Sequence, residues 1–299
     1  MRAKEKAYSK LNLALKVGAK NDGFHLLDGI AVTVDLFDTV TVEPRRDDKI
    51  VLNAAGLREY VYNCTPTEDN AYKAAQVFAE KYSTGGVNIT VKKAIPLSGG
   101  MGGSSTDAAA VLRAMAKLYK IEDDLTSLAN LLGSDTAYLL NGGFARLRGR
   151  GEIIKPLSVS QTLHFAVVYP EKGVNTTACF AEFDKNPISK LSDSDIDNLE
   201  NYLTTLGGYF DYDDFLNNLQ VCKNDLYPAA KSIEPCVGAA FEAVAALSPS
   251  VTFMTGSGST VCGIFPTEQL ARWAVDKLKQ SGYDSEYLHS VVPSVKKPR

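Results

Sequence analysis

The sequence predicts an α+β protein of two domains: an N-terminal mixed α/β domain, then a C-terminal antiparallel sheet with helices on one face. Its 299 residues correspond to about two domains at ~100–200 residues each. The first half alternates between strand-like and helix-like hydrophobic periods, whereas the second half runs helix, strand, turn, strand, helix, strand. We expect the first domain to span residues 1–157 and the second to span residues 158–299.

The elements of the first domain follow from changes of period. Residues 28–44 are rich in Val, Thr and Ile, which is typical of a pair of strands or of one long bent strand. From residue 70 to residue 82 the apolar side chains recur at helical spacing, and residues 87–92 are strand-like again. Two further helical stripes follow over residues 108–119 and 125–132, the last ending at a glycine.

The chain on both sides of the expected domain boundary and beyond it is less regular. Residues 143–156 and 163–169 are strand-like, and they are followed by a polar, acidic stretch over residues 184–215 with weak helical signals. The C-terminal elements are then expected in this order: a helix near 236–247, strands near 251–254 and 260–265, and a helix at 267–280.

Composition excludes several classes of protein. The formal net charge of −3 argues against a nucleic-acid or acidic-membrane partner. The five cysteines form no CxxC pair, which favours free thiols in a reducing compartment. The charged N-terminus is unlike a signal peptide, and no run reaches the ~18 apolar residues of a membrane span. We expect a cytoplasmic protein.

The segment that carries chemistry is residues 96–107, PLSGGMGGSSTD, which directly precedes an amphipathic helix. Glycine allows close approach of the backbone to a ligand, and the first turn of a helix presents free N–H groups and partial positive charge. Together these features favour a phosphate-binding loop. The alternative is a flexible loop in which Ser104 or Ser105 caps the helix. The Walker A pattern is absent.

Three other features suggest a function only if that loop binds phosphate. Residues 255–260, TGSGST, lie between two apolar strands and are by themselves typical of a hairpin turn. Lys10 interrupts an apolar strand-like run, and Asp135 lies at an expected helix start. A solvated strand residue and an ordinary helix cap are the simpler interpretations of these two, and spacing alone does not link them.

The motifs resemble those of the GHMP kinases. Residues 96–108 are similar to the family's phosphate loop, P-x-x-x-G-L-G-x-S-S, with Met101 in place of Leu. Residues 8–13, YSKLNL, resemble the N-terminal motif, and residues 255–259 resemble the third motif. Residues 22–25, DGFH, resemble an element of one branch of the family, which acts on a cytidine diphosphate (CDP)-linked methylerythritol.

This resemblance implies the two-domain GHMP kinase fold, ATP and Mg²⁺ as cofactors, and a pair of catalytic residues. Asp135 would act as general base or orient the acceptor hydroxyl, and Lys10 would hold that hydroxyl and lower its pKa. No metal ligands are assigned. The residues implied to bind ATP are Asn70, Lys93, Pro96, Gly99, Gly100, Met101, Gly102, Gly103, Ser104, Ser105 and Thr106.

The acceptor implied by the resemblance is the 2-hydroxyl of CDP-methylerythritol, an intermediate of non-mevalonate isoprenoid synthesis. Its cytosine would stack between Phe24 and Phe180, while His25 reads the edge of the base. The implied substrate-binding residues are Asn12, Phe24, His25, Thr176 and Phe180. A GHMP kinase for another alcohol and a non-catalytic nucleotide-binding homologue are the alternatives, and the chain would be a monomer or a homodimer.

Overall fold

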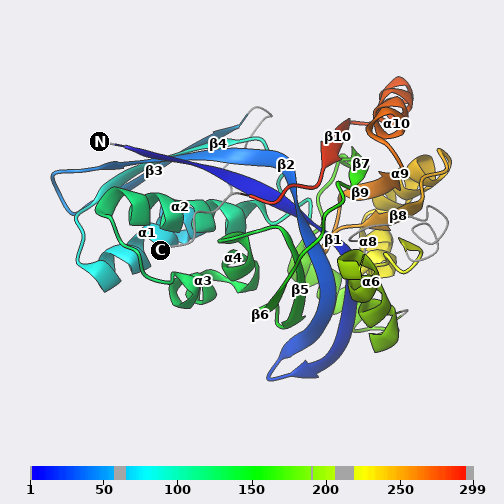
Figure 1. Ribbon diagram of the computed structural model, residues 1–299, viewed down its shortest axis with the longest axis horizontal. Coiled ribbons are helices and arrows are strands. Elements are labelled where there is room, and N and C mark those ends of the chain that lie inside the picture. The colour runs from blue at the N-terminus through cyan, green and yellow to red at the C-terminus, as the bar shows by residue number, and fades with distance from the viewer. Residues whose placement is uncertain (1, 57–64, 190, 206–218, 294–299) are drawn as a thin grey trace.

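The computed structural model describes residues 2–56, 65–189, 191–205 and 219–293, which form two sheets with helices packed on them (Figure 1). The six-stranded sheet has the order β3-β4-β2-β5-β6, with β1 paired to β2, and the four-stranded sheet has the order β10-β7-β9-β8. Only the β3–β4 pair is parallel among the described strand pairs. The predicted fold class is therefore confirmed.

The bounds of the elements are as follows. The six-stranded sheet contains β1 (Ala3–Asn21), β2 (Phe24–Pro44), β3 (Ile50–Gly56), β4 (Val87–Lys93), β5 (Phe144–Gly149) and β6 (Ile153–Leu157). The four-stranded sheet contains β7 (His164–Val168), β8 (Val251–Met254), β9 (Val261–Phe265) and β10 (Ser285–His289). The helices are η1 (Pro66–Glu68), α1 (Asn70–Tyr82), α2 (Gly103–Tyr119), α3 (Thr126–Leu132), α4 (Ser134–Leu139), α5 (Thr176–Phe183), α6 (Asp193–Thr205), α8 (Tyr227–Ile233), α9 (Pro235–Ala245) and α10 (Glu268–Gln280).

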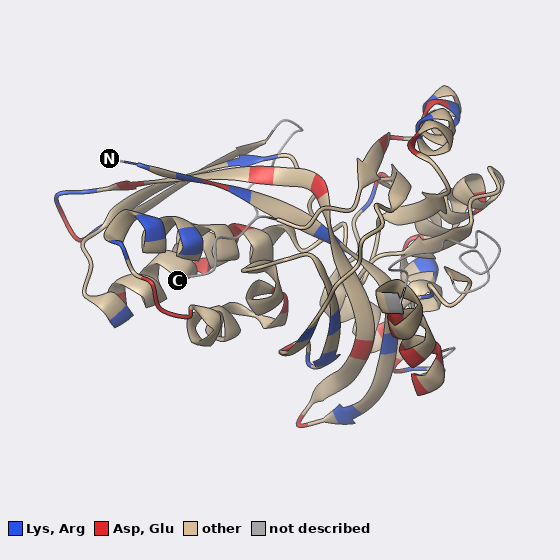
Figure 2. Ribbon diagram, viewed as in Figure 1, with Lys and Arg blue, Asp and Glu red and all other residues tan. Residues whose placement is uncertain are grey.

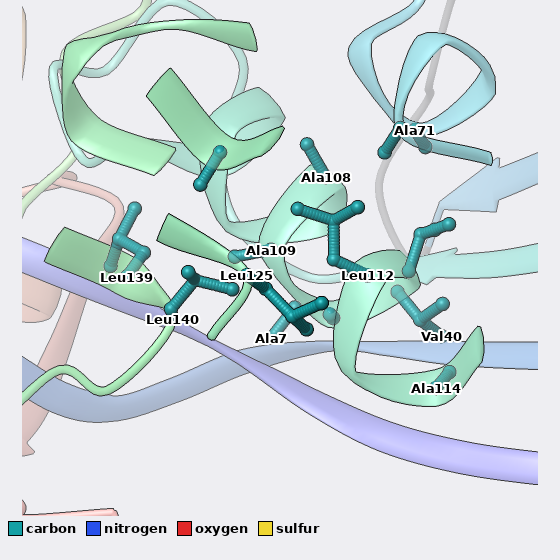
Figure 3. Close-up of a cluster of buried hydrophobic side chains, with 14 of the residues drawn as sticks. Ala7, Val40, Ala71, Ala108, Ala109, Leu112, Ala114, Leu125, Leu139 and Leu140 are labelled. Carbon is teal, nitrogen blue, oxygen red and sulfur yellow. The ribbon is translucent and has the colours of Figure 1, made fainter. Parts of the chain in front are cut away.

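Helix α2 forms the centre of the N-terminal core. Its small residues Ala108 and Ala109 and its larger Leu112 are fully buried, together with Ala7 of β1 and Val40 of β2 (Figure 3). Because alanine side chains are short, the helix lies close to the sheet, and α1 and α4 pack on its flanks. This packing fixes the position of the N-terminus of α2, where the glycine-rich loop ends.

The long hairpin of β1 and β2 is part of the six-stranded sheet and also packs against the four-stranded sheet (Figure 1). Leu11 of β1 and Ile30 of β2 share a buried cluster with Phe165 of β7 and Phe253 of β8. Residues 28–44 thus lie in one long strand, β2, rather than in a pair of strands. Because this buried cluster contains residues of both sheets, the domain boundary at residue 157 stays a prediction.

Charge and thiol chemistry are unremarkable in the described part of the chain. Acidic and basic residues are interspersed along both halves of the ribbon (Figure 2). Cys179, Cys222, Cys236 and Cys262 are free, whereas Cys64 lies outside the described residues. Of the described helices, none has the length and apolar character that crossing a bilayer requires.

Candidate active site

The two glycine-rich segments pack directly against each other. A Cβ added to Gly100 would lie 2.3 Å from the carbonyl oxygen of Thr255, and one added to Gly256 would lie 2.5 Å from the carbonyl oxygen of Gly100. Both glycines also have positive φ, +73° and +57°. The Thr260 N–H donates to the Gly99 carbonyl at 3.2 Å. The β8–β9 turn is therefore a support for the first loop as well as a hairpin turn.

Helix α2 begins at this support without a side-chain cap. Gly102 occupies the N-cap position with a left-handed backbone (φ +75°), so it offers no side-chain oxygen to the N–H groups of the first turn. Gly103, Ser104 and Ser105 form that turn, and all three line a cavity of about 470 Å³. The uncapped N–H groups and the helix dipole together favour an anion at this point.

The cavity gathers most of the residues singled out from the sequence. It lies between the first turn of α2, the β8–β9 turn and the inner parts of β1 and β2. The predicted site residues that line it are Lys10, Asn12, Lys93, Pro96, Gly99, Gly100, Met101, Gly102, Gly103, Ser104, Ser105, Asp135, Thr176 and Phe180. Four predicted residues, Phe24, His25, Asn70 and Thr106, are not part of this lining within the described chain.

Lys10 and Asp135 meet inside the cavity, although 125 positions separate them. Lys10 Nζ lies 3.6 Å from Asp135 Oδ2, with the lysine side chain 5% exposed and the aspartate 35% exposed. The register of β1 on β2 shifts between Tyr8 and Lys10, which turns the lysine out of the regular strand alternation. Its N–H donates to the Met101 carbonyl at 3.0 Å and its Nζ donates to Asn12 Oδ1. The backbone of Lys10 is therefore hydrogen-bonded to the glycine-rich loop.

Two of the residues predicted to bind ATP, Thr106 and Asn70, do not line the cavity. The hydroxyl of Thr106 donates to the Tyr8 carbonyl at 2.8 Å, and its N–H donates to the Gly102 carbonyl at 2.9 Å. Thr106 thus joins α2 to β1, and both of its donors are used inside the protein. Asn70 is the first residue of α1, and its neighbour Asp69, which accepts from the Ala71 N–H, lines the cavity in its place.

The aromatic residues expected to sandwich a base are arranged differently. Phe180 of α5 lines the cavity and stacks on the imidazole of His25, with ring centroids 5.4 Å apart. Phe24 is 53% exposed. The Arg150 guanidinium carbon lies over the Phe24 ring, 3.9 Å from the ring centroid. Because successive side chains of a strand point to opposite faces, Phe24 and His25 diverge. The structure therefore pairs His25, and not Phe24, with Phe180.

The imidazole of His25 is held at both nitrogens. Nδ1 lies 2.8 Å from the Gly18 carbonyl oxygen, and Nε2 lies 2.8 Å from Asp184 Oδ1. Hydrogen bonds from His25 and Lys20 hold the pKa of Asp184 below its usual range, with the Lys20 contact contributing most. The two contacts, to a carbonyl oxygen and to a carboxylate oxygen, fix the orientation of the ring.

Several residues of this region were missed in the sequence. Asn224 donates from Nδ2 to the carbonyls of Met254 and Gly256, at 2.8 and 2.6 Å, and so fixes the second loop. Asp38 and Asp107 both accept from the ammonium of Lys93. Residues 224–226, NDL, resemble a motif of the family's C-terminal domain and are the signal that could have identified Asn224. Asp38 had none, because only folding brings it to a lysine 55 positions away.

Comparison with known proteins agrees with this geometry. The model of the GHMP kinase N-terminal domain matches residues 69–145. A putative 4-diphosphocytidyl-2-C-methyl-D-erythritol kinase of Streptococcus agalactiae serotype III is 32% identical over 284 residues, covering 93% of this chain and 95% of the relative. One of Streptococcus mutans serotype c is 32% identical, with 92% and 94% covered.

A solved structure supports the same relationship. The crystal structure of a 4-(cytidine 5'-diphospho)-2C-methyl-D-erythritol kinase is similar, with a TM-score of 0.73 and 27% identity, covering 96% of this chain and 99% of the other. The chain therefore belongs to the GHMP kinase family of ATP-using small-molecule kinases.

Proposed function

We propose that the protein transfers the γ-phosphoryl group of ATP to the 2-hydroxyl of 4-diphosphocytidyl-2-C-methyl-D-erythritol. The observation that carries this proposal is the meeting of Lys10 and Asp135, 3.6 Å apart, in the same cavity as the uncapped first turn of α2. The curated relatives and the solved structure named above are the grounds for choosing this acceptor.

The phosphates of ATP belong at the N-terminus of α2. The N–H groups of Gly103, Ser104 and Ser105 and the two serine hydroxyls supply hydrogen bonds to anionic oxygens there. The backbone of residues 99–102 closes the cradle on one side. The described residues contain no group of three His, Cys, Asp or Glu side chains placed to hold a metal ion. Mg²⁺ bound together with the nucleotide would neutralise phosphate charge during the transfer.

Asp135 and Lys10 act on the acceptor hydroxyl. The Asp135 carboxylate accepts the hydroxyl proton while the acceptor oxygen forms its bond to the γ-phosphorus and the bond to the β–γ bridging oxygen breaks, releasing ADP. Lys10 holds the acceptor oxygen and stabilises the negative charge that develops on it. Asn12 orients the lysine, because its Oδ1 accepts from Nζ. The pair therefore supplies both the proton acceptor and the charge that in-line transfer needs.

The cytidine diphosphate portion extends toward α5. Phe180 offers a ring face at the cavity wall, and Thr176, whose hydroxyl lies 2.9 Å from the Ser257 hydroxyl, adds a polar group near the second loop. We place the cytosine against Phe180. Contacts of Phe24 and His25 with the base stay predictions, because His25 already stacks on Phe180 and bonds to Asp184.

A panel of acceptors tests the assignment. Coupled ADP release is measured with CDP-methylerythritol, mevalonate and homoserine under the same conditions. We expect turnover with the CDP-linked polyol and little with the other two. Turnover with mevalonate or homoserine but not with the CDP-linked polyol would contradict the proposed acceptor and leave a GHMP kinase of another specificity.

Replacing Phe180 tests the place of the base. Phe180→Ala is expected to raise the KM for CDP-methylerythritol about tenfold, because one base–ring stack contributes roughly 1–3 kcal/mol, and to leave the KM for ATP near its original value. Phe180→Tyr keeps the ring and serves as the matched control. Equal KM values for the acceptor in the alanine variant and the wild type would remove Phe180 from the acceptor site.

A further inference from the structure

Two hydroxyl groups meet in the wall of the cavity, one from each side. Thr176 Oγ1 of α5 lies 2.9 Å from Ser257 Oγ of the β8–β9 turn, and both residues line the cavity. Ser257 is 8% exposed, and it is not one of the site residues implied by the resemblance. Within the described structure, each hydroxyl of this pair has the other as its hydrogen-bond partner and no further one.

The hydroxyl pair, Thr176 and Ser257, carries one more O–H group than its own contact uses. Each hydroxyl has one hydrogen, and a hydrogen bond between two hydroxyls consumes one of the two. The N–H groups of Gly256 and Ser257 also make no hydrogen bond to other described residues. Gly256 has a left-handed backbone, with φ +57°, and successive N–H groups in such turns form concave sites that favour anions. The unspent donors therefore call for acceptor oxygens.

On the α5 side, the hydroxyl pair lies next to the ring proposed for the base. Thr176 and Phe180 are four residues apart in α5, so their side chains share one face of the helix, with Cβ atoms about 5–6 Å apart. Both side chains line the cavity. A group bound at the hydroxyl pair is therefore about one helical turn from a base stacked on Phe180.

On the other side, the turn that carries Ser257 is joined to the reacting end of the cavity. The hydroxyl of Thr255, two residues before Ser257, accepts from the Asn12 N–H at 2.8 Å. Asn12 Oδ1 in turn accepts from Lys10 Nζ, which lies 3.6 Å from Asp135 Oδ2. The hydroxyl pair thus lies between the place of the base and the place of the phosphoryl transfer.

An alcohol linked to cytidine diphosphate has its groups in the same order: base, ribose, diphosphate, and then the polyol with the reacting hydroxyl. With the base on Phe180 and the polyol at Lys10, the diphosphate falls at the hydroxyl pair. The cations among the described residues that line the cavity are Lys10 and Lys93, and both are already paired with carboxylates. The diphosphate is therefore left to neutral donors, which the hydroxyl pair and its turn supply.

We propose that Ser257 and Thr176 bind the diphosphate of the acceptor, each hydroxyl donating to a phosphate oxygen, and that the N–H groups of Gly256 and Ser257 complete this subsite. Ser257 is then a specificity-determining residue that favours alcohols linked to a nucleoside diphosphate over free alcohols. This inference rests on the proposed function, since it takes the acceptor to extend from Phe180 to Lys10.

Calorimetric titration separates binding of the diphosphate from binding of the base. CDP and cytidine are each titrated into the wild type, Ser257→Ala and Thr176→Val, with the nucleotide site filled by Mg²⁺ and a non-hydrolysable ATP analogue. We expect the wild type to bind CDP more tightly than cytidine. Each variant should raise the Kd for CDP about 10- to 100-fold, the loss typical of a hydrogen bond to a charged group, and leave the Kd for cytidine near the wild-type value.

Two control variants accompany these measurements. Thr176→Ser keeps the hydroxyl and should bind CDP nearly as tightly as the wild type. Ser194→Ala removes one hydroxyl of an exposed pair, 2.8 Å from Ser192 Oγ and away from the cavity lining, and should change neither Kd. In turnover assays, Ser257→Ala and Thr176→Val should raise the KM for CDP-methylerythritol and leave the KM for ATP near its original value.

Three results would overturn this inference and leave the kinase assignment intact. The first is a ratio of the CDP and cytidine Kd values that is the same in both variants as in the wild type. The second is an equal rise of both Kd values, which would make the hydroxyl pair a structural contact. The third is weaker binding of the ATP analogue instead of CDP, which would assign the pair to the nucleotide. Turnover of the wild type with CDP-methylerythritol tests the proposed function separately, and its absence would remove both.

Discussion

Replacing Asp135 by Asn is expected to lower kcat by about 10²–10⁴-fold and to leave the KM for ATP nearly unchanged. Asparagine keeps the size of the side chain but does not accept the hydroxyl proton. The proposed nucleotide site lies elsewhere, at the first turn of α2. The effect should therefore appear in kcat, measured by coupled ADP release at saturating acceptor.

A surface aspartate provides the control for this variant. Asp123 is exposed and lies between α2 and α3, so Asp123→Asn makes the same chemical change away from the cavity and should leave kcat unaltered. An Asp135→Asn enzyme with wild-type kcat would mean that the acid of the Lys10–Asp135 pair has no part in the transfer. The non-catalytic homologue, the alternative left open by the sequence, predicts that the wild type itself binds ATP without turnover.

The second large effect is expected at the contact between the two loops. Gly100→Ala should destabilise the protein by about 2–5 kcal/mol, because left-handed backbone costs an L-residue roughly 1–2 kcal/mol and overpacking adds about 1–3 kcal/mol. The added Cβ would lie 2.3 Å from the Thr255 carbonyl oxygen and 3.0 Å from backbone atoms of Gly258. Backbone atoms cannot rotate away as a side chain does. The KM for ATP should rise as well, because the loop carries the proposed phosphate site.

Gly282→Ala is the matched control for Gly100→Ala. Gly282 has φ +85°, similar to the +73° of Gly100, but a Cβ there meets nothing within 4 Å. Gly282→Ala therefore measures the backbone strain alone, and we expect it to lower the free energy of unfolding by about 1–2 kcal/mol. Urea unfolding with a constant m-value measures both variants. Equal losses for the two variants would show that the packing of one loop on the other contributes nothing to stability.

Local periodicity predicted most of the fold. The helix expected over residues 70–82 is α1 with the same bounds, and the strand near 251–254 is β8. Helices and strands of this kind depend on hydrophobic spacing within a short window. The sequence left open whether residues 28–44 form one long bent strand or a pair of strands. Pairing with β1, β4 and β5 decides for β2, a single strand of 21 residues. The last strand of the expected C-terminal order is β10, which pairs with β7.

The candidate site was predicted where a motif carried it and missed where only folding assembles it. The glycine-rich loop, Lys10 and Asp135 come together in one cavity, as the resemblance implied. The arrangement of Phe24 was not predictable, because a motif fixes neither strand face nor rotamer. The Asp38–Lys93–Asp107 triad has no local signature either, since β2, β4 and α2 contribute one member each.

The central claim is that the two glycine loops and the Lys10–Asp135 pair form one phosphoryl-transfer site. Phosphorus NMR of the protein with ATP, Mg²⁺ and CDP-methylerythritol tests it most directly. We expect a new phosphomonoester signal that grows in step with ADP in the wild type and is nearly absent in Asp135→Asn, which still binds ATP. A wild-type protein that binds ATP yet forms no phosphomonoester, or an Asp135→Asn variant that forms it at the wild-type rate, would contradict the claim.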